Sequence, residues 1–181
     1  FNPITTGVPF LSIAPDARGG AMGDVGAATS PDAYSQYWNP SKFAFIDGAG
    51  GVSLSYTPWL RKLVKDIDLA YLSGYYKIAD IQTVSASLRY FSLGEVMIRK
   101  DATSPAITAK PYDLAVDASY ARILAENFSM GVTLRFIYSD LLGGAPVEEA
   151  ESLTPGAAVA ADISAFYSSP VVFPAGAGLA R

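Results

Sequence analysis

The strongest constraint on this 181-residue chain is a period-two alternation of apolar and polar residues that begins near residue 50. In residues 127–139 the even positions carry Phe, Met, Val, Leu, Phe and Tyr, whereas the odd positions carry mostly Ser, Gly, Thr and Arg. Alternate side chains of a β-strand point to opposite faces, so the pattern predicts a strand with one apolar face. The same pattern occurs in residues 52–57, 67–78, 82–90, 112–121 and 157–167. We expect a seventh strand to begin at Val171.

The connections between the predicted strands alternate in length. Short links at residues 79–80, 123–126 and 168–170 alternate with long ones at residues 58–66, 93–111 and 140–156. Short periplasmic turns and long extracellular loops are typical of outer-membrane β-barrels. We therefore predict an all-β fold, a transmembrane antiparallel β-barrel of the bacterial outer membrane. A soluble β-sandwich is the alternative, although its connections vary in length without such polarity.

Aromatic residues near the strand ends favour the membrane. The apolar positions carry Phe128 and Tyr138 on one predicted strand, and Tyr112 and Tyr120 on another. Ten residues of a tilted strand climb roughly 25 Å, the height of an apolar band that is flanked by aromatic girdles. The opposite positions carry mostly Ser, Thr, Gly and Ala, which suit a crowded or hydrated lumen. One face is therefore expected to meet lipid and the other to line the barrel.

Composition excludes several functional classes. The chain contains no Cys and no His, so it has neither disulfides nor the thiolate and imidazole groups of many catalytic and metal sites. Its net charge of −4 argues against nucleic-acid binding, which requires a basic face. Pro170 and Pro174 interrupt the longest uncharged stretch, which argues against a transmembrane helix there. We expect no cofactor, no metal and no enzymatic activity.

The first 48 residues have no sustained periodicity and are rich in Gly, Pro, Ala, Ser and Asp. Gly20, Gly23 and Gly26 form a G-x-x-G-x-x-G pattern that matches neither a dinucleotide fingerprint nor a P-loop, so tight backbone packing is the favoured interpretation. Ser30 is predicted to cap a short helix over residues 33–38. That helix should end before Asn39 and Pro40.

Two further groups of residues are candidates for function. Arg89, Asp113 and Arg135 all fall on the inward-facing positions, and we predict that they form a lumenal charge ladder that braces the wall or holds the N-terminal segment. In the long loop after residue 139, an apolar run is unusual for an exposed connection. We predict that it binds a protein partner through Leu141, Leu142, Pro146 and Val147.

Two motifs in the N-terminal segment carry a family resemblance. Residues 18–29 read RGGAMGDVGAAT, and residues 37–44 read YWNPSKFA. They resemble the N-terminal region of FadL-like outer-membrane barrels, and more closely that of the PorV (LptO) family of the type IX secretion system of Bacteroidetes. The resemblance covers about the first 56 residues. Ser41 departs from the usual Ala after Asn39 and Pro40, which is one small residue for another.

The resemblance implies a fourteen-stranded FadL-type barrel that is not an enzyme. Such proteins bind secreted cargo through its C-terminal signal domain, associate with a large translocon barrel, and work with sortase-like proteins that attach cargo to lipopolysaccharide at the surface. By analogy with FadL, residues 1–48 would be a lumenal plug and residues 49–181 membrane-spanning strands. About seven predicted strands are half of such a barrel, so we expect the chain to be part of a longer protein. A FadL-like transporter of hydrophobic small molecules is the alternative function.

Overall fold

The computed structural model describes residues 8–58, 66–98, 107–141, 143 and 155–169. Six strands form one antiparallel sheet in the order β1-β2-β3-β6-β7-β8, and two short strands form a separate ribbon. The six strands are β1 (Gly50–Pro58), β2 (Ile67–Ala79), β3 (Gln82–Leu93), β6 (Tyr112–Ala125), β7 (Phe128–Asp140) and β8 (Gly156–Tyr167). The prediction of an all-β, antiparallel fold is therefore confirmed. Val171, where a seventh strand was expected, lies outside the described residues.

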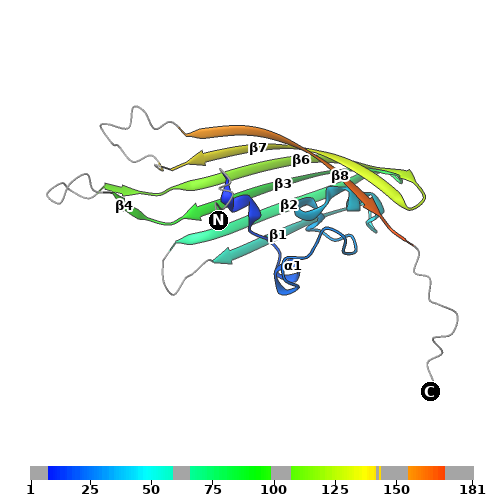
Figure 1. Ribbon diagram of the computed structural model, residues 1–181, viewed down its shortest axis with the longest axis horizontal. Helices are drawn as coiled ribbons and strands as arrows, with labels where there is room; N and C mark the ends of the chain where they lie inside the picture. The colour runs from blue at the N-terminus through cyan, green and yellow to red at the C-terminus, as the bar shows by residue number, and fades with distance from the viewer. Residues whose placement is uncertain (1–7, 59–65, 99–106, 142, 144–154, 170–181) are drawn as a thin grey trace, which may run out of the picture.

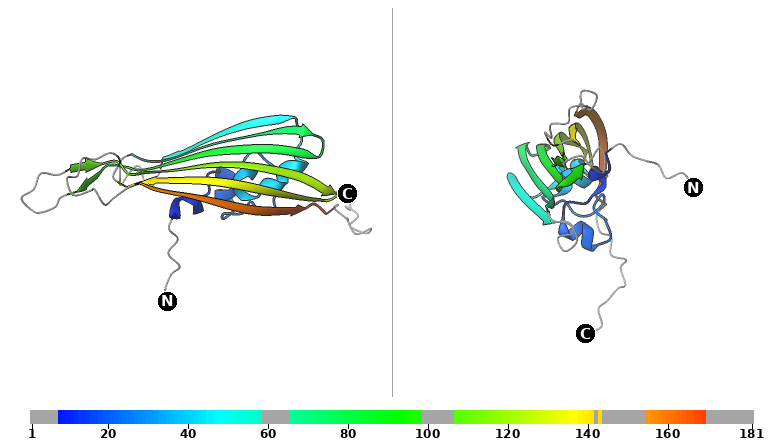
Figure 2. Two further views of the ribbon diagram at one scale, coloured as in Figure 1. Left: turned by 90° about the horizontal axis from the view of Figure 1, so that it is seen from above. Right: turned by 90° about the vertical axis from the view of Figure 1, so that its left-hand side faces the viewer.

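The sheet is a curved meander in which each long strand pairs with the next one along the chain (Figure 1). Seen end-on, the strands lie around an arc, with the N-terminal segment in blue on its concave side (Figure 2). Within the described residues the sheet is open, because β1 and β8 each pair on one side only. The period-two strands thus form one curved sheet around a single interior.

The predicted long link over residues 93–111 contains structure of its own. Strand β4 (Val96–Ile98) and strand β5 (Ile107–Ala109) pair as an antiparallel ribbon beyond the end of the sheet. Gly94 lies between β3 and β4 with φ of +81°, a backbone conformation that favours glycine. This residue ends β3, so the Val96–Ile98 strand does not continue the main sheet.

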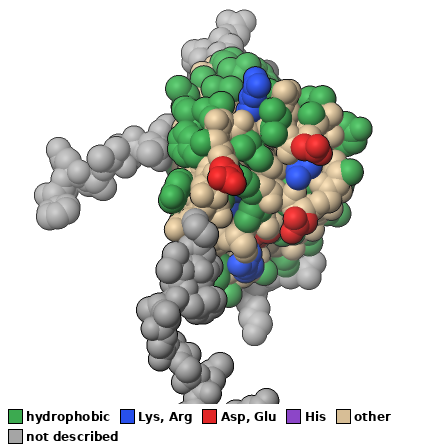
Figure 3. Space-filling model, turned by 90° about the vertical axis from the view of Figure 1, so that its right-hand side faces the viewer, with side chains coloured by type: hydrophobic (Ala, Val, Ile, Leu, Met, Phe, Trp, Pro, Cys, Tyr) green, Lys and Arg blue, Asp and Glu red, His purple; other side chains and the backbone are tan. Residues whose placement is uncertain are grey.

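The two faces of the sheet have opposite character. The outer face, formed by the even-numbered residues of β1, β2, β3, β6 and β7 and the odd-numbered residues of β8, is apolar and exposed: Val52 is 79%, Leu134 64% and Ile163 77% exposed. In an end view, green hydrophobic side chains cover much of the rim, while most charged side chains lie further in (Figure 3). Such a large exposed apolar surface marks contact with lipid or protein.

Tyrosines gather at one end of the outer face. Tyr90 and Tyr112 stack with their ring centroids 5.8 Å apart, and Tyr138 lies 6.1 Å from Tyr112. The register places Tyr90 and Tyr138 on either side of Leu114 in one row across β3, β6 and β7. Tyrosines in such a row have the arrangement of an interfacial aromatic girdle. No helix among the described residues is long and apolar enough to cross a membrane.

The inner face, formed by the alternate residues of the same strands, is polar and is covered by the N-terminal segment (residues 8–49). This segment contains η1 (Pro9–Ser12), α1 (Ala17–Ala21), α2 (Ser35–Trp38) and η2 (Pro40–Phe45). The predicted helix over 33–38 starts later, at Ser35, and Ser30 does not cap it. Asp32 turns the chain instead, since its carboxylate accepts hydrogen bonds from the Tyr34 N–H and the Ser35 hydroxyl.

Replacing Leu134 with Lys distinguishes a lipid-facing from a water-facing outer surface. A lysine on the lipid face costs about 2–4 kcal/mol at the bilayer midplane, whereas an exposed substitution in water stays within about 0.5 kcal/mol. We expect the free energy of unfolding, measured by urea titration in lipid vesicles, to fall by the larger amount. Met97→Lys, at an equally exposed position in the β4–β5 ribbon, is the control and should be nearly neutral. Equal effects of both variants would contradict a lipid-facing Leu134.

Candidate functional site

The candidate site is the interface between the N-terminal segment and the inner face of the sheet. Arg89 of β3 is a buried cation of this interface, with 2% of the residue exposed. Its Nη1 donates to the Leu11 carbonyl at 2.9 Å and to the Phe10 carbonyl at 3.4 Å. The guanidinium lies over the rings of Tyr37 and Tyr71, at 4.6 and 5.3 Å from their centroids. Arg89 therefore holds η1 against the sheet through two carbonyls and two aromatic rings.

Gln36 joins helix α2 to two neighbouring strands, β3 and β6. Its amide donates to the Ser119 hydroxyl at 2.7 Å, and its carbonyl oxygen accepts from the Ser85 hydroxyl at 2.6 Å. Ser119 also shares a hydrogen bond of 2.7 Å with Thr133. All four side chains are buried, so each hydroxyl needs a partner inside the protein. One amide from the N-terminal segment thus satisfies polar groups of β3 and β6 and supports a third on β7.

Asn39 and Pro40 position η2 on the sheet. The Asn39 carbonyl oxygen accepts from the Ser41 N–H at 3.2 Å, which caps η2, and Pro40 occupies the first position of that helix. The Asn39 amide donates to Ala27 at 3.1 Å and to Ala165 of β8 at 3.0 Å. Asn39 therefore ties the N-terminal segment to the last described strand.

Ser41 is fully buried. Its hydroxyl contacts the Asn39 carbonyl oxygen, and its own carbonyl accepts from the Ser129 hydroxyl at 2.8 Å. The added hydroxyl therefore has a partner within the capping turn.

Lys42 is fully buried beneath the glycine-rich stretch. Its Nζ donates to the Gly26 carbonyl at 2.8 Å and to the Thr29 hydroxyl at 3.1 Å. Burial lowers the pKa of this amine, and the nearby Asp32 carboxylate partly offsets the effect. Sequence reasoning missed Lys42 and Gln36, because a lone Lys or Gln in a short irregular segment usually faces solvent.

The three glycines of the G-x-x-G-x-x-G pattern have different environments. A Cβ at Gly26 would lie 2.3 Å from the Trp38 ring, whose Nε1 donates to Asp16 at 3.0 Å. Gly23 has φ of +80°, which favours glycine for conformational reasons. A Cβ at Gly20 would meet no atom within 4 Å. Close packing against Trp38 therefore explains the glycine at position 26.

The residues of the predicted charge ladder have separate partners. Arg135 pairs with Asp117 at 2.6 Å and with Asp162 at 3.4 Å. Arg89 lies beside η1, as described above. Asp113 is buried, and the register sets it opposite Ser139 of β7 and Phe91 of β3. The structure thus brings Arg135 together with two carboxylates that link β6, β7 and β8, and Asp117 also accepts from Ser87 of β3 at 3.0 Å.

The predicted partner-binding loop is described only in part. Leu141 follows β7 and is 66% exposed. Leu142, Pro146 and Val147 lie outside the described residues. Gly143 donates from its backbone N–H to the Asp140 carboxylate at 2.9 Å, which shapes the start of the loop. An exposed leucine at this position is compatible with a contact surface.

Taken together, these contacts hold a segment in place. Most of the buried polar groups at this interface are paired across it or within one of its two sides, whereas the Tyr71 hydroxyl and the Arg89 Nε are buried without a hydrogen-bond partner among the described residues. Within the described residues, no group of three or more acidic side chains could hold a metal ion. The arrangement can brace a wall and fix a segment against it.

An open antiparallel sheet with an exposed apolar face, an aromatic row and a polar interior defines an all-β protein of the outer-membrane barrel type. The family model of the type IX secretion system protein PorV matches residues 2–175. The chain therefore belongs to the PorV family, and it is a component of the type IX secretion system. A search of curated proteins found no match. The family implies a location in the outer membrane.

Gly26→Ala and Gly20→Ala form a matched pair that tests the packing of the N-terminal segment. At Gly26 the added methyl group meets the Trp38 ring, and overpacking of this kind typically costs about 1–3 kcal/mol. At Gly20, inside α1, the methyl group enters open space and should stabilise the helix by about 0.4–1 kcal/mol. Amide hydrogen exchange of residues 16–42 should therefore rise in the first variant and fall in the second. Equal changes would contradict the packing of Gly26 against Trp38.

Arg89→Met tests whether the guanidinium holds η1. Loss of a charge-assisted hydrogen bond of about 1.5 kcal/mol should raise amide exchange in residues 9–13 roughly tenfold, because Leu11 and Phe10 lose their donor. Arg122→Met, on the exposed side of β6, is the control and should leave this exchange unchanged. Unchanged exchange in Arg89→Met would show that η1 is held by its apolar contacts alone.

Proposed function

We propose that this protein receives secreted cargo through its C-terminal signal domain at the type IX translocon and passes it to the surface attachment machinery. The observation that carries this proposal is the family match, which spans residues 2–175 and so includes both the N-terminal motifs and the strands. In this role the protein works in the outer membrane beside a large translocon barrel and sortase-like attachment proteins, among lipopolysaccharide. It acts by binding and has no catalytic step.

The structure favours recognition outside the lumen. The inner face is covered by residues 8–49, which hydrogen-bond its buried Arg89, Ser85 and Ser119 side chains. A cargo domain would have to displace this segment in order to bind within. The long loops at the far ends of the strands are free of that requirement. We therefore place cargo recognition on the loop that begins at Leu141 and continues through Leu142, Pro146 and Val147.

The polarity of the inner face also bears on the alternative, a transporter of hydrophobic small molecules. Such a transporter requires an apolar lumenal passage. The buried polar residues of the inner face include Ser73, Thr83, Ser85, Ser87, Asp117, Ser119 and Thr133. The apolar cluster of Phe10, Ala115 and Ile137 is filled by η1 itself. A plug formed by residues 1–48 fits this wall better than a fatty-acid pathway does.

Leu141→Asp tests the cargo-binding loop. An introduced carboxylate at the centre of an apolar contact surface typically costs about 2 kcal/mol or more. We expect capture of a purified cargo signal domain by the protein in outer-membrane extracts to fall roughly tenfold or more. Leu124→Asp is the matched control, because Leu124 is 58% exposed at the opposite end of the sheet. Its capture of cargo should remain unchanged.

Two outcomes would contradict the proposal. Equal capture by Leu141→Asp and the unchanged protein would remove the loop from the recognition surface. Co-purification of fatty acid with no retention of any cargo signal domain would instead support the transporter.

A further inference from the structure

The first helix of the N-terminal segment, η1, has fewer polar contacts with the sheet than the later part of the segment has. Within the described residues, both hydrogen bonds between η1 and the sheet come from Arg89. The later part is joined to the sheet through side chains or backbone carbonyls of Pro15, Ala33, Gln36, Asn39, Ser41 and Phe43. Separate attachment allows η1 to leave the wall while the rest of the segment stays in place.

The contact between Arg89 and η1 leaves polar groups of the wall unsatisfied. The Arg89 Nε and the Tyr71 hydroxyl are buried, and within the described part of the chain neither has a hydrogen-bond partner. The two residues face each other across β2 and β3. A buried polar group without a partner costs free energy, because it has lost its bonds to water. The arrangement with η1 on the wall therefore carries a cost that is relieved when η1 moves away.

Arg89 also lies within reach of a carboxylate that has no partner. The register sets Arg89 opposite Ala115 of β6, so Asp113 and Asp117 are its diagonal neighbours. Diagonal neighbours in an antiparallel pair are about 7–8 Å apart, a distance that a long side chain can span. Asp117 already accepts from two side chains, as described above. Asp113 is buried too, and it has no hydrogen bond or ion pair among the described residues.

Phe10 of η1 lies between these two charges. Arg89 and Phe91 of β3 face Ala115 and Asp113 of β6, so the four residues form a quartet with Arg89 and Asp113 on one diagonal. Phe10 packs against both members of the other diagonal: it clusters with Ala115, and its ring stacks on Phe91 with centroids 6.4 Å apart. Its ring therefore crosses the line from Arg89 to Asp113. While η1 is on the wall, the cation and the carboxylate are kept apart.

We propose that η1 is a latch with two positions. In the closed position, which the structure shows, Phe10 separates Arg89 from Asp113, and Arg89 binds the carbonyls of η1. In the open position η1 leaves the wall, and the Arg89 guanidinium pairs with the Asp113 carboxylate. This pair offsets part of the loss of the carbonyl contacts, so the open position is populated as a minor state. Access to the inner wall at this end then depends on the pair, independently of where cargo binds.

Single cysteines can report the opening, because the chain has no Cys of its own. Ala115 lies under η1, whereas Ala121, on the same face of β6, is opposite Thr83, whose hydroxyl donates to Phe43 of η2. Both alanines are 1% exposed, so they are matched positions. In the purified protein in lipid vesicles, we expect maleimide to label Ala115→Cys faster than Ala121→Cys, because η1 opens locally.

Asp113→Asn removes the carboxylate on which the open position depends. Added to Ala115→Cys, it should slow labelling about threefold, the effect of a solvent-accessible ion pair. Asp113→Glu keeps the charge and should leave the rate nearly unchanged. Asp162→Asn removes a carboxylate from the same inner wall, where it pairs with Arg135, and is the matched control with no expected effect. In an Arg89→Met background, Asp113→Asn should no longer slow labelling.

Three results would overturn the proposal. Equal labelling of the two cysteine variants would show that η1 does not open separately from η2. Unchanged or faster labelling in Asp113→Asn would show that the carboxylate does not favour the open position. An equal effect of Asp113→Asn with and without the Arg89 guanidinium would show that the two charges do not pair.

Discussion

The polar inner face of the sheet is the constraint on which the rest of the structure depends. A sheet with its apolar side chains turned outward buries hydroxyls and charges on its concave side, and each of these must find a hydrogen-bond partner. Some of these groups pair within the sheet, and the N-terminal segment supplies further partners through Gln36 and the backbone carbonyls of η1. The short helices and turns of this segment present many polar groups to the concave face of the sheet.

The same constraint explains how charge is distributed. Arg135 is held by Asp117 and Asp162, which lie on the two strands that flank β7. Arg89 and Lys42 have no carboxylate within ion-pair distance among the described residues, and carbonyls solvate them instead. A cation solvated by carbonyls of a particular segment fixes that segment, because no other part of the wall offers the same oxygens. Arg89 thus contacts η1 from the sheet, Lys42 joins η2 to residues 26–29 within the N-terminal segment, and Arg135 pairs with carboxylates of β6 and β8.

The period-two pattern sufficed to predict all six long strands, because the alternation of apolar and polar residues is visible in the sequence itself. The partners across strands could not be predicted in the same way. The hairpin between β6 and β7 sets Arg135 opposite Asp117, with Asp113 opposite Ser139 at the far end, and its register shifts between Ile123 and Ala125. Counting residues from an approximately placed turn therefore assigns cross-strand partners that are several residues away from the true ones. The late start of α2 was equally hidden, because its N-cap is Tyr34, which makes no side-chain cap, and Asp32 forms the turn that precedes it.

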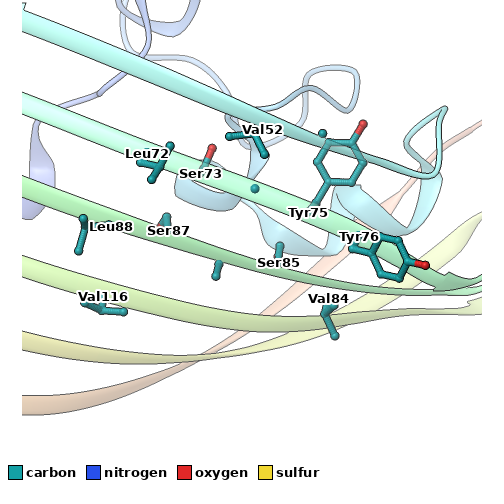
Figure 4. Close-up of a pocket in the computed structure, with 13 residues that line it drawn as sticks. Val52, Leu72, Ser73, Tyr75, Tyr76, Val84, Ser85, Ser87, Leu88 and Val116 are labelled. Carbon is teal, nitrogen blue, oxygen red and sulfur yellow. The ribbon is translucent and has the colours of Figure 1, made fainter.

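The outer face shows why small residues matter where no core exists. On a lipid-facing surface, Gly74 and Ala86 contribute little to stability, because larger side chains there would be equally well solvated by hydrocarbon. Their contribution is shape, since the larger residues of the adjoining rows leave a groove only where these two are small (Figure 4).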